Sequence, residues 1–312
     1  MRVIVVGLGV QGHKRVSVAG ADCVATVDPA VPGAAYGDLG EVPAGDYDGA
    51  LVCTPDAAKR PLLEKLLGAG KHVLVEKPLG IGDSASVESL GNLARTQGVV
   101  CYTAYNHRFE PHFVRMRDVI RSGRLGDIYT LRMFYGNGTA RLVRDSEWRD
   151  QGSGVLADLG SHLLDTLEFW LGERRTEFEL IEARRFENRA FDFVSVLAPG
   201  LPSVHLEMTL LSWRNHFYAD VLGSRGSAHI RSLCKWGPSS FTVRERRLPS
   251  GRPDEEASTL VQPDPTWALE YSAFKEMCVD PPANEYGNTG KDIWIDASLA
   301  SLAEQARQRF PE

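Results

Sequence analysis

The chain begins, after Met1 and Arg2, with Val3-Ile4-Val5-Val6-Gly7-Leu8-Gly9-Val10-Gln11-Gly12, and this stretch decides the fold. Its four β-branched apolar residues predict a buried strand, and a helix-periodic run, Val10–Ala19, follows the glycines directly. At such a junction Gly7 permits a tight turn, Gly9 lets a diphosphate approach the backbone, and Gly12 lets helix and strand pack closely. The stretch therefore predicts the first strand–turn–helix unit of a dinucleotide-binding fold.

A second feature of the predicted dinucleotide site is the acid that ends the next strand, Asp28. The backbone amides at Val10 and Gln11 open the helix and suit a diphosphate. The Asp28 carboxylate would accept hydrogen bonds from ribose hydroxyls and repel a 2′-phosphate, which favours NAD over NADP. The alternative interpretation of Asp28 is a turn residue before Pro29.

The first hundred residues alternate short β-branched runs with helix-periodic segments, which predicts a parallel sheet covered by helices. We expect strands at Val3–Val6, Cys23–Asp28, Gly49–Thr54, His72–Glu76 and Val99–Tyr102, and helices at Val10–Ala19, Asp56–Ala69 and Asp83–Thr96. The link from Pro29 to Pro43 is rich in Gly and Pro, so no long helix is expected there.

After about residue 104 the pattern changes to successive strands, which predicts a mostly antiparallel sheet. We expect strands at Phe191–Leu197, Ser203–Ser212, Phe217–Leu222 and Ala228–Ser232, helices at Pro111–Ser122, Val155–Leu171 and Asp292–Arg307, and an exposed loop at Leu248–Pro265. The expected organisation is α/β, with a doubly wound Rossmann domain over 1–104 and an α/β domain over 105–312. The helix at 292–307 is a candidate to pack back on the first domain.

Composition indicates an ordinary soluble globular protein whose expected partner is a small molecule. The 312 residues include 43% hydrophobic and 24% charged residues, with a net charge of −6. The basic residues are scattered, which argues against nucleic acid and anionic membranes as partners. The five cysteines lack paired spacing and are expected to be reduced, and no signal peptide or membrane span is expected. These features predict a cytoplasmic protein.

A second informative stretch is Asp158-Leu159-Gly160-Ser161-His162-Leu163-Leu164-Asp165. A spacing of four places Asp158 and His162 on one helix face, and a carboxylate beside an imidazole suits proton transfer. Two alternatives stay open. Asp158 could cap the helix while His162 donates a structural hydrogen bond. Asp and His at this spacing also ligate zinc, although no third ligand with suitable spacing is present, so no metal is expected.

Two further motifs follow strands of the predicted parallel sheet, namely Thr54-Pro55 and Glu76-Lys77-Pro78. Ligands bind outside the carboxyl ends of parallel strands, so both motifs are expected to approach the cofactor. Lys77 in particular is expected near the nicotinamide. The alternative is an ordinary surface lysine.

These motifs in this order resemble the Gfo/Idh/MocA family, the glucose-fructose oxidoreductase and inositol dehydrogenase group. The segments that carry the resemblance are Gly7–Gly12, Thr54-Pro55, Gly70–Leu79, Tyr105–Phe109, Gly152–Asp165 and Gly223–Gly226. The resemblance implies a Rossmann domain followed by a domain with a large, open, mostly antiparallel sheet. It also implies a homo-oligomer, a dimer or tetramer, formed through that sheet. Family members often carry Asn and His where this chain has Asp56 and Lys59.

The resemblance also implies NAD(P)-dependent redox chemistry at a carbinol carbon of a sugar, cyclitol or nucleotide-sugar. It assigns Lys77, Asp158 and His162 as the catalytic trio, with His162 taking the hydroxyl proton and Lys77 stabilising the oxygen. We further expect Tyr105, Asn106, Arg108 and Asp165 to contact substrate at the domain junction; the alternative is a helix-entry cluster around Phe109. Two other functions stay open: an NAD-dependent glycosidase that works by transient oxidation and elimination, and a non-catalytic dinucleotide-binding regulator.

Overall fold

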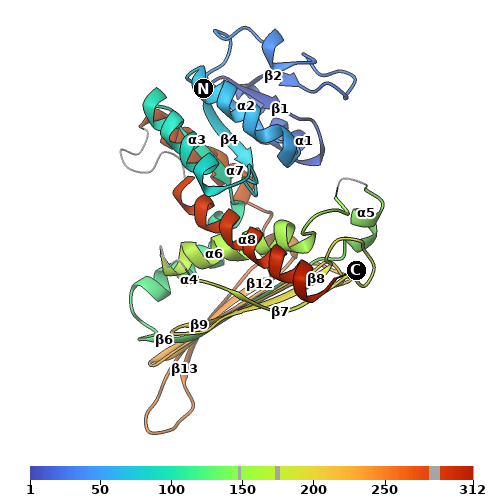
Figure 1. The fold of residues 1–312 in the computed structure, drawn as a ribbon. Coiled ribbons are helices and arrows are strands. Elements are labelled where there is room, and N and C mark those ends of the chain that lie inside the picture. Colours follow the sequence, from blue (N-terminus) through green and yellow to red (C-terminus); the bar gives the residue numbers. More distant parts are fainter. Residues whose placement is uncertain (147–148, 173–175, 281–288, 312) are drawn as a thin grey trace. The chain divides into compact units, whose positions relative to one another are not determined.

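The computed structural model describes residues 1–146, 149–172, 176–280 and 289–311, and the chain forms two compact units. The first unit comprises Met1–Asn106 and Thr266–Ala297, and the second comprises His107–Pro265 and Ser298–Glu312 (Figure 1). The first unit therefore draws on two separate parts of the sequence.

The first unit is built on a five-stranded parallel sheet with strand order β2-β1-β3-β4-β5. Its strands are β1 (Val3–Val6), β2 (Cys23–Val27), β3 (Gly49–Val52), β4 (His72–Glu76) and β5 (Cys101–Ala104). Its helices are α1 (Val10–Ala19), α2 (Asp56–Gly68), α3 (Ser84–Gln97) and α7 (Thr266–Val279). Right-handed crossovers place α1 on one face and α2 with α3 on the other; α2 contacts α3, and α1 contacts α7. The predicted doubly wound Rossmann sheet is confirmed.

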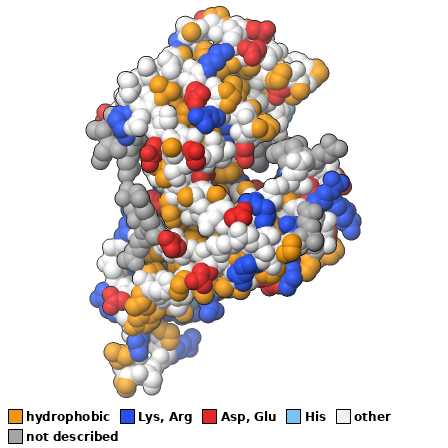
Figure 2. Space-filling view, viewed as in Figure 1, with side chains coloured by type: hydrophobic (Ala, Val, Ile, Leu, Met, Phe, Trp, Pro, Cys, Tyr) orange, Lys and Arg blue, Asp and Glu red, His pale blue; other side chains and the backbone are white. Residues whose placement is uncertain are grey.

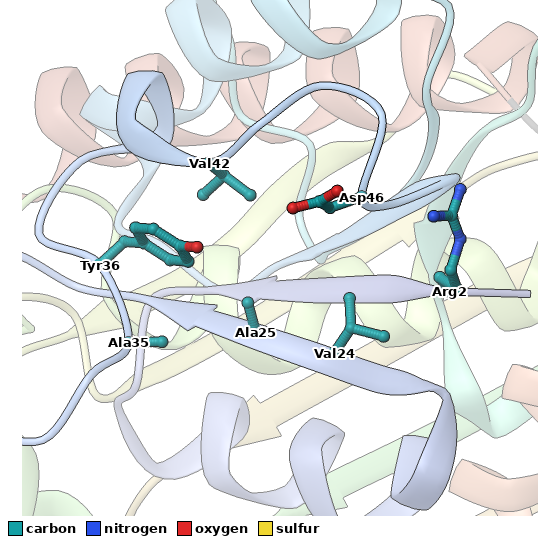
Figure 3. A pocket seen from close by; sticks show the side chains of 7 residues that line it. All are labelled: Arg2, Val24, Ala25, Ala35, Tyr36, Val42 and Asp46. Atoms are coloured by element: carbon teal, nitrogen blue, oxygen red, sulfur yellow. The ribbon is translucent and has the colours of Figure 1, made fainter.

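The strand order reverses between β1 and β3, and ligands of such sheets bind where the order reverses, outside the carboxyl ends. The link from β2 to β3, all of it described, has η2 (Leu39–Glu41) as its only helix, as predicted. Without a covering helix, a hollow of about 450 Å³ remains beside β2 (Figure 3). Val24 and Ala25 line it from the strand, and Tyr36 and Val42 from the link. No predicted site residue lines it.

The second unit is built on an eight-stranded sheet with strand order β13-β12-β11-β10-β6-β9-β8-β7. The strands are β6 (Ile128–Gly136), β7 (Glu179–Arg184), β8 (Phe193–Ala198), β9 (Ser203–Thr209), β10 (His216–Gly223), β11 (Gly226–Arg231), β12 (Ser239–Glu245) and β13 (Asp254–Leu260). Only the β6–β9 pair among them is parallel. The predicted large, mostly antiparallel sheet is confirmed.

Helices cover one face of this sheet (Figure 1). The helices α4 (Pro111–Arg121) and α6 (Ser161–Leu171) contact each other, and α4 contacts β11 and β12. A short helix, α5 (Ala140–Arg144), follows β6, and α8 (Thr289–Arg309) begins in the first unit and ends in the second. Because strand side chains alternate between faces, Leu131, Met133 and Tyr135 of β6 are buried on the helix side.

The prediction of a loop over Leu248–Pro265 is wrong, because β13 lies within it. Most of its side chains are exposed, so the strand lacks the apolar alternation that would reveal it in the sequence. Its position at the sheet edge explains the charge: Arg244 of β12 donates to Glu255 across the pair at 2.7 Å. Five further elements were not predicted from the sequence, namely β6, β7, β12, α5 and α7.

The apolar character of the helices and the surface charge were also compared with the sequence. Within the described residues, no helix combines the length and apolar character that crossing a membrane requires. On the face drawn in Figure 2, acidic and basic side chains both occur among many neutral ones. The scattered charge of the sequence is thus also scattered on this face.

Candidate active site

The glycine-rich turn has the geometry that the fingerprint predicts. Gly7 has φ of +91°, and a Cβ there would lie 2.7 Å from the Cys53 carbonyl oxygen. A Cβ on Gly12 would lie 1.9 Å from the Gly7 carbonyl oxygen, so the chain itself requires both glycines. Gly9 differs, since a Cβ there would meet no described atom within 4 Å. The open space over Gly9, at the N-terminus of α1, fits the close approach of a diphosphate.

Asp28 is tied to this turn. Its carboxylate accepts a hydrogen bond from the backbone amide of Leu8 at 2.7 Å, and from those of Ala30 and Val31 at 2.8 and 3.1 Å. These amides, that of Leu8 foremost, lower the pKa of Asp28 below its ordinary value. The bonds to Ala30 and Val31 are those of a turn residue, and the bond to Leu8 also places the charged group beside the predicted diphosphate turn.

Thr54 and Pro55 follow β3 at the same edge of the sheet. Pro55 is the N-cap residue of α2. The Thr54 hydroxyl oxygen is buried, and it has no hydrogen-bond partner among the described residues. The Thr54 methyl group would lie 3.1 Å from a Cβ on Gly7, so the hydroxyl stands next to the glycine-rich turn. Because a buried polar atom without a partner is costly, this hydroxyl fits a site that a polar ligand completes.

Glu76, the residue before Lys77, is held by a buried ion-pair network. Arg15 of α1 contacts the Glu76 carboxylate at 2.7 Å and the Glu270 carboxylate of α7 at 2.8 Å. Arg15 is 1% exposed and Glu270 is fully buried, and the guanidinium lies 4.3 Å from the Trp267 ring centroid. Burial raises the pKa of Glu270 to about 7, although Arg15 opposes this shift. The network fixes the strand end from which Lys77 extends.

Asp56 and Lys59, the two residues that depart from the family pattern, also support the segment that follows β4. The buried Lys59 ammonium donates to the Pro78 carbonyl oxygen and pairs with the Asp56 carboxylate at 2.7 Å. Lys59 therefore connects α2 to the Glu76-Lys77-Pro78 segment. Sequence spacing gave no signal of this contact, because the partner is a backbone oxygen 19 residues away.

Tyr105 and Asn106 follow β5 and are engaged within the first unit. The Asn106 side-chain amide donates to the Thr266 hydroxyl at 2.8 Å. Tyr105 is fully buried, with the Lys291 ammonium 4.5 Å from its ring centroid. Their expected contact with substrate stays a prediction.

Asp158 and His162 lie in the second unit, on one continuous helical segment. The sequence predicted a regular helix, but Leu156–Gly160 forms a π-helical turn, a feature frequent at functional sites, and α6 follows it. A Cβ on Gly160 would lie 2.9 Å from the Met208 sulfur of β9, so the glycine lets this turn approach the sheet. The Asp158 carboxylate lies 3.8 Å from the Arg149 guanidinium.

His162 lies among rings. Its side chain is buried, and its imidazole stacks on that of His107 with ring centroids 4.1 Å apart and an interplanar angle of 19°. The Tyr135 ring of β6 lies 6.0 Å away. Burial raises the pKa of Tyr135, and the charges of Asp158 and Asp264 add to the shift, so the phenol stays neutral. His107 was not predicted from the sequence to have a role, because no motif or spacing connects it to His162.

Arg108 and Asp165, both predicted to contact substrate, are partners of each other. The Arg108 Nε atom lies 3.0 and 3.1 Å from the two Asp165 carboxylate oxygens, and the guanidinium also bonds Glu168. Asp165 is fully buried. This cluster joins the segment before α4 to α6 and thereby steadies the helix that carries His162.

Among the described residues, no group of three or more His, Cys, Asp or Glu side chains is placed to hold a metal ion.

The first unit gathers the dinucleotide motifs at one sheet edge. There the glycine-rich turn follows β1, Asp28 follows β2, Thr54 follows β3, and Lys77 follows β4. The second unit gathers Asp158 and His162.

Comparisons with known proteins match both units. The model described as "Oxidoreductase family, NAD-binding Rossmann fold" matches residues 1–105, and that of the "GFO/IDH/MocA C-terminal domain" matches 113–229. The chain is 31% identical over 270 residues to mouse trans-1,2-dihydrobenzene-1,2-diol dehydrogenase, covering 86% of this chain and 76% of the mouse protein. It is 27% identical over 192 residues to inositol 2-dehydrogenase of Rhizobium meliloti, covering 59% and 57%.

A solved structure has the same fold. The inositol dehydrogenase homologue of Azotobacter vinelandii, complexed with NADH and myo-inositol, superposes with a TM-score of 0.79. The superposition covers 99% of this chain and 96% of that protein, at 19% sequence identity. At 19% sequence identity, this similarity shows a shared fold and no more.

Proposed function

The chain belongs to the GFO/IDH/MocA family of NAD-binding oxidoreductases, and from this premise we propose that it oxidises a carbinol carbon of a sugar or cyclitol, or reduces the corresponding ketone. The relatives support the substrate class, because their names specify a cyclic diol and inositol. The observation that carries the proposal is the sheet edge where open space over Gly9 and the buried Thr54 hydroxyl adjoin the strand end bearing Lys77. That edge fits a dinucleotide.

NAD held at this edge, over Gly9 and beside Asp28 and Thr54, would supply the hydride acceptor. We propose that His162 takes the hydroxyl proton as the general base, since an imidazole titrates near neutral pH. Lys77 donates a hydrogen bond to the same oxygen and stabilises the negative charge that develops there. Asp158 orients the substrate and supports the protonation states of the other two. In the reductive direction His162 or Lys77 returns the proton.

A substrate screen tests this function. Sugars, inositols, cyclic trans-diols and nucleotide-sugars are supplied with NAD, and the corresponding ketones with NADH, while the absorbance of NADH is followed. We expect turnover with at least one cyclic polyol. Tight NAD binding without turnover would instead indicate a regulator. Release of chromophore from a glycoside with no net NADH would indicate the glycosidase.

Asp28→Ala is expected to weaken NAD binding about 10- to 100-fold while NADP binding falls less, because charge-assisted hydrogen bonds to the ribose are lost. Calorimetric titration of both dinucleotides measures the preference. Asp28→Asn is the matched control for the turn, since its side-chain oxygen can still accept from Ala30 and Val31. An unchanged preference in both variants would show that Asp28 is only a turn residue.

We propose that the chain forms a dimer or tetramer through the sheet face opposite the helices. Its support is the aromatic and apolar surface on that face. Phe134 and Tyr218 stack with ring centroids 5.4 Å apart, and Ile181 is 46% exposed. A hollow of about 300 Å³ on this face is lined by Thr130, Arg132, Ile181, Leu197, Ser203 and His205. Light scattering at micromolar concentration is expected to give a multiple of 34.3 kDa, and a monomer would refute the proposal.

The state of the cysteines supports a cytoplasmic location. All five are free thiols, and Cys101 and Cys234 are buried. Buried free thiols behave as small apolar side chains and suit a reducing compartment. We propose that the enzyme works in the cytoplasm.

A further inference from the structure

A lysine stands next to the stacked imidazoles of the second unit. The Lys235 ammonium nitrogen lies 3.4 Å from the Nε2 atom of His107, and the His107 ring stacks on that of His162. An ammonium group has donors and no acceptor. The contact therefore requires that Nε2 of His107 accepts, so that His107 is a neutral ring with its proton on Nδ1.

Both partners are held in place. His107 is 2% exposed, and it packs against Phe113 and Tyr135 with ring centroids 5.6 and 5.4 Å away. Lys235 lies in the 3-10 turn η5 (Cys234–Trp236), which Glu110 fastens. The Glu110 carboxylate accepts from the Cys234 amide at 3.0 Å and from its thiol at 3.1 Å. These bonds set the point from which Lys235 reaches His107.

We propose that His107 and Lys235 are positioning residues for His162: the neutral His107 ring fixes the plane of the His162 imidazole, and the nearby ammonium charge keeps that imidazole unprotonated at neutral pH. The proposal rests on the role of His162 as general base. A base must be unprotonated to accept the hydroxyl proton, so the ammonium extends the pH range of activity downwards. In this role neither residue contacts the reacting atoms.

The charges around His162 oppose one another. The groups that face this region are Asp158 and Asp165 from its own helical segment, His107 and Arg108 from the segment before α4, Glu110 from the start of α4, Tyr135 from β6, Arg149 from the loop before the π-helical turn, Lys235 from η5 and Asp264 from the segment after β13. The carboxylates favour a proton on His162, and the cations disfavour it. Removing one cation therefore has a definite sign: it makes His162 easier to protonate.

Lys235→Met and Lys235→Arg form the matched test. In Lys235→Met, loss of the cation that contacts the ring stacked on His162 is expected to raise the midpoint of His162 protonation by about one to two pH units, the order expected for a unit charge about 6–12 Å away at an effective dielectric constant near 20. The acid limb of the kcat/KM profile moves up by the same amount. Lys235→Arg keeps the charge and is expected to keep the wild-type midpoint. Lys235 is only partly buried, so both variants are expected to fold.

The midpoint is read directly by NMR of histidine-labelled protein without substrate, with the His162 signal assigned through His162→Gln. A midpoint that is equal in wild type and Lys235→Met overturns the proposal, whatever the activity. A midpoint that moves in Lys235→Met while the kcat/KM profile does not move upholds the electrostatic role and instead removes His162 as the base. The two failures are thus distinct.

His107→Phe supplies a second measurement. The phenyl ring can still stack on His162 and pack on Phe113, but it offers Lys235 no acceptor nitrogen. We expect the midpoint of His162 protonation to rise, because the Lys235 ammonium is no longer held at its position. The melting temperature is expected to change little. Wild-type values of both midpoint and pH profile in His107→Phe would show that the ring contact is structural and overturn its positioning role.

Discussion

His162→Ala is expected to lower turnover by a factor of about 10² to 10⁴ while NAD affinity stays close to that of wild type. NAD affinity is expected to be kept because the dinucleotide motifs lie in the first unit, whereas His162 lies in the second. Turnover is measured with the substrate found in the screen, and NAD affinity by calorimetry on the same preparation.

The variant His162→Gln distinguishes a loss of the base from a loss of packing. His162 is buried against His107, so alanine leaves a void that disturbs the surrounding rings. His162→Gln fills more of that space but cannot act as a base near neutral pH. An equal loss of turnover in both variants, with unchanged NAD affinity, supports the catalytic role. Full activity in either variant would remove His162 from the mechanism.

Arg15→Met is expected to lower the free energy of unfolding by about 3–5 kcal/mol, because it leaves the fully buried Glu270 carboxylate and the partly buried Glu76 carboxylate without their cation. The loss is largest above pH 7. Burial raises the pKa of Glu270 to about 7 even with Arg15 present, and removing the cation raises that pKa further, so as the pH falls the carboxyl takes up a proton and the penalty shrinks. Urea unfolding at pH 6 and pH 8 measures both values.

The chain offers a matched control for this experiment. Arg60 and Glu64 form an ion pair at 3.0 Å on α2, with both side chains about half exposed. Arg60→Met is expected to cost about 1 kcal/mol or less, because it breaks this exposed helix pair and the hydrogen bond that Arg60 donates to the Ser86 hydroxyl at 2.9 Å. If Arg15→Met costs no more than Arg60→Met at pH 8, then the buried network does not hold Glu76 in place.

The cofactor-binding unit could be predicted from the sequence because its signals are local. A buried strand, a glycine-rich turn and a helix occupy adjacent residues, and β1, α1 and β4 have the predicted bounds. The edge strand β13 and the helix α7 lack such signals. The first carries charged, exposed side chains, and the second is recognisable as part of the first unit only through contacts such as that of Glu270 with Arg15.

The same distinction applies to the site. Gly7, Gly9, Asp28 and His162 stand out because each occupies a set position in a short motif. Their supporting partners do not, since these are fixed by tertiary contacts between distant segments. Lys235 meets His107 across 128 residues of sequence. Periodicity and spacing carry no information about such pairs.

The ion pair of Arg15 with Glu270 spans 255 residues, and this separation has a consequence for synthesis on the ribosome. Chains are made from the N-terminus at about 5–20 residues per second, so α1 leaves the ribosome long before α7 exists. Until then the guanidinium of Arg15 lacks one of its two buried carboxylates, and helix α1 lacks the helix that packs on it. The interior of the nascent Rossmann unit is therefore completed only after α7 has been synthesised, more than 250 residues after α1.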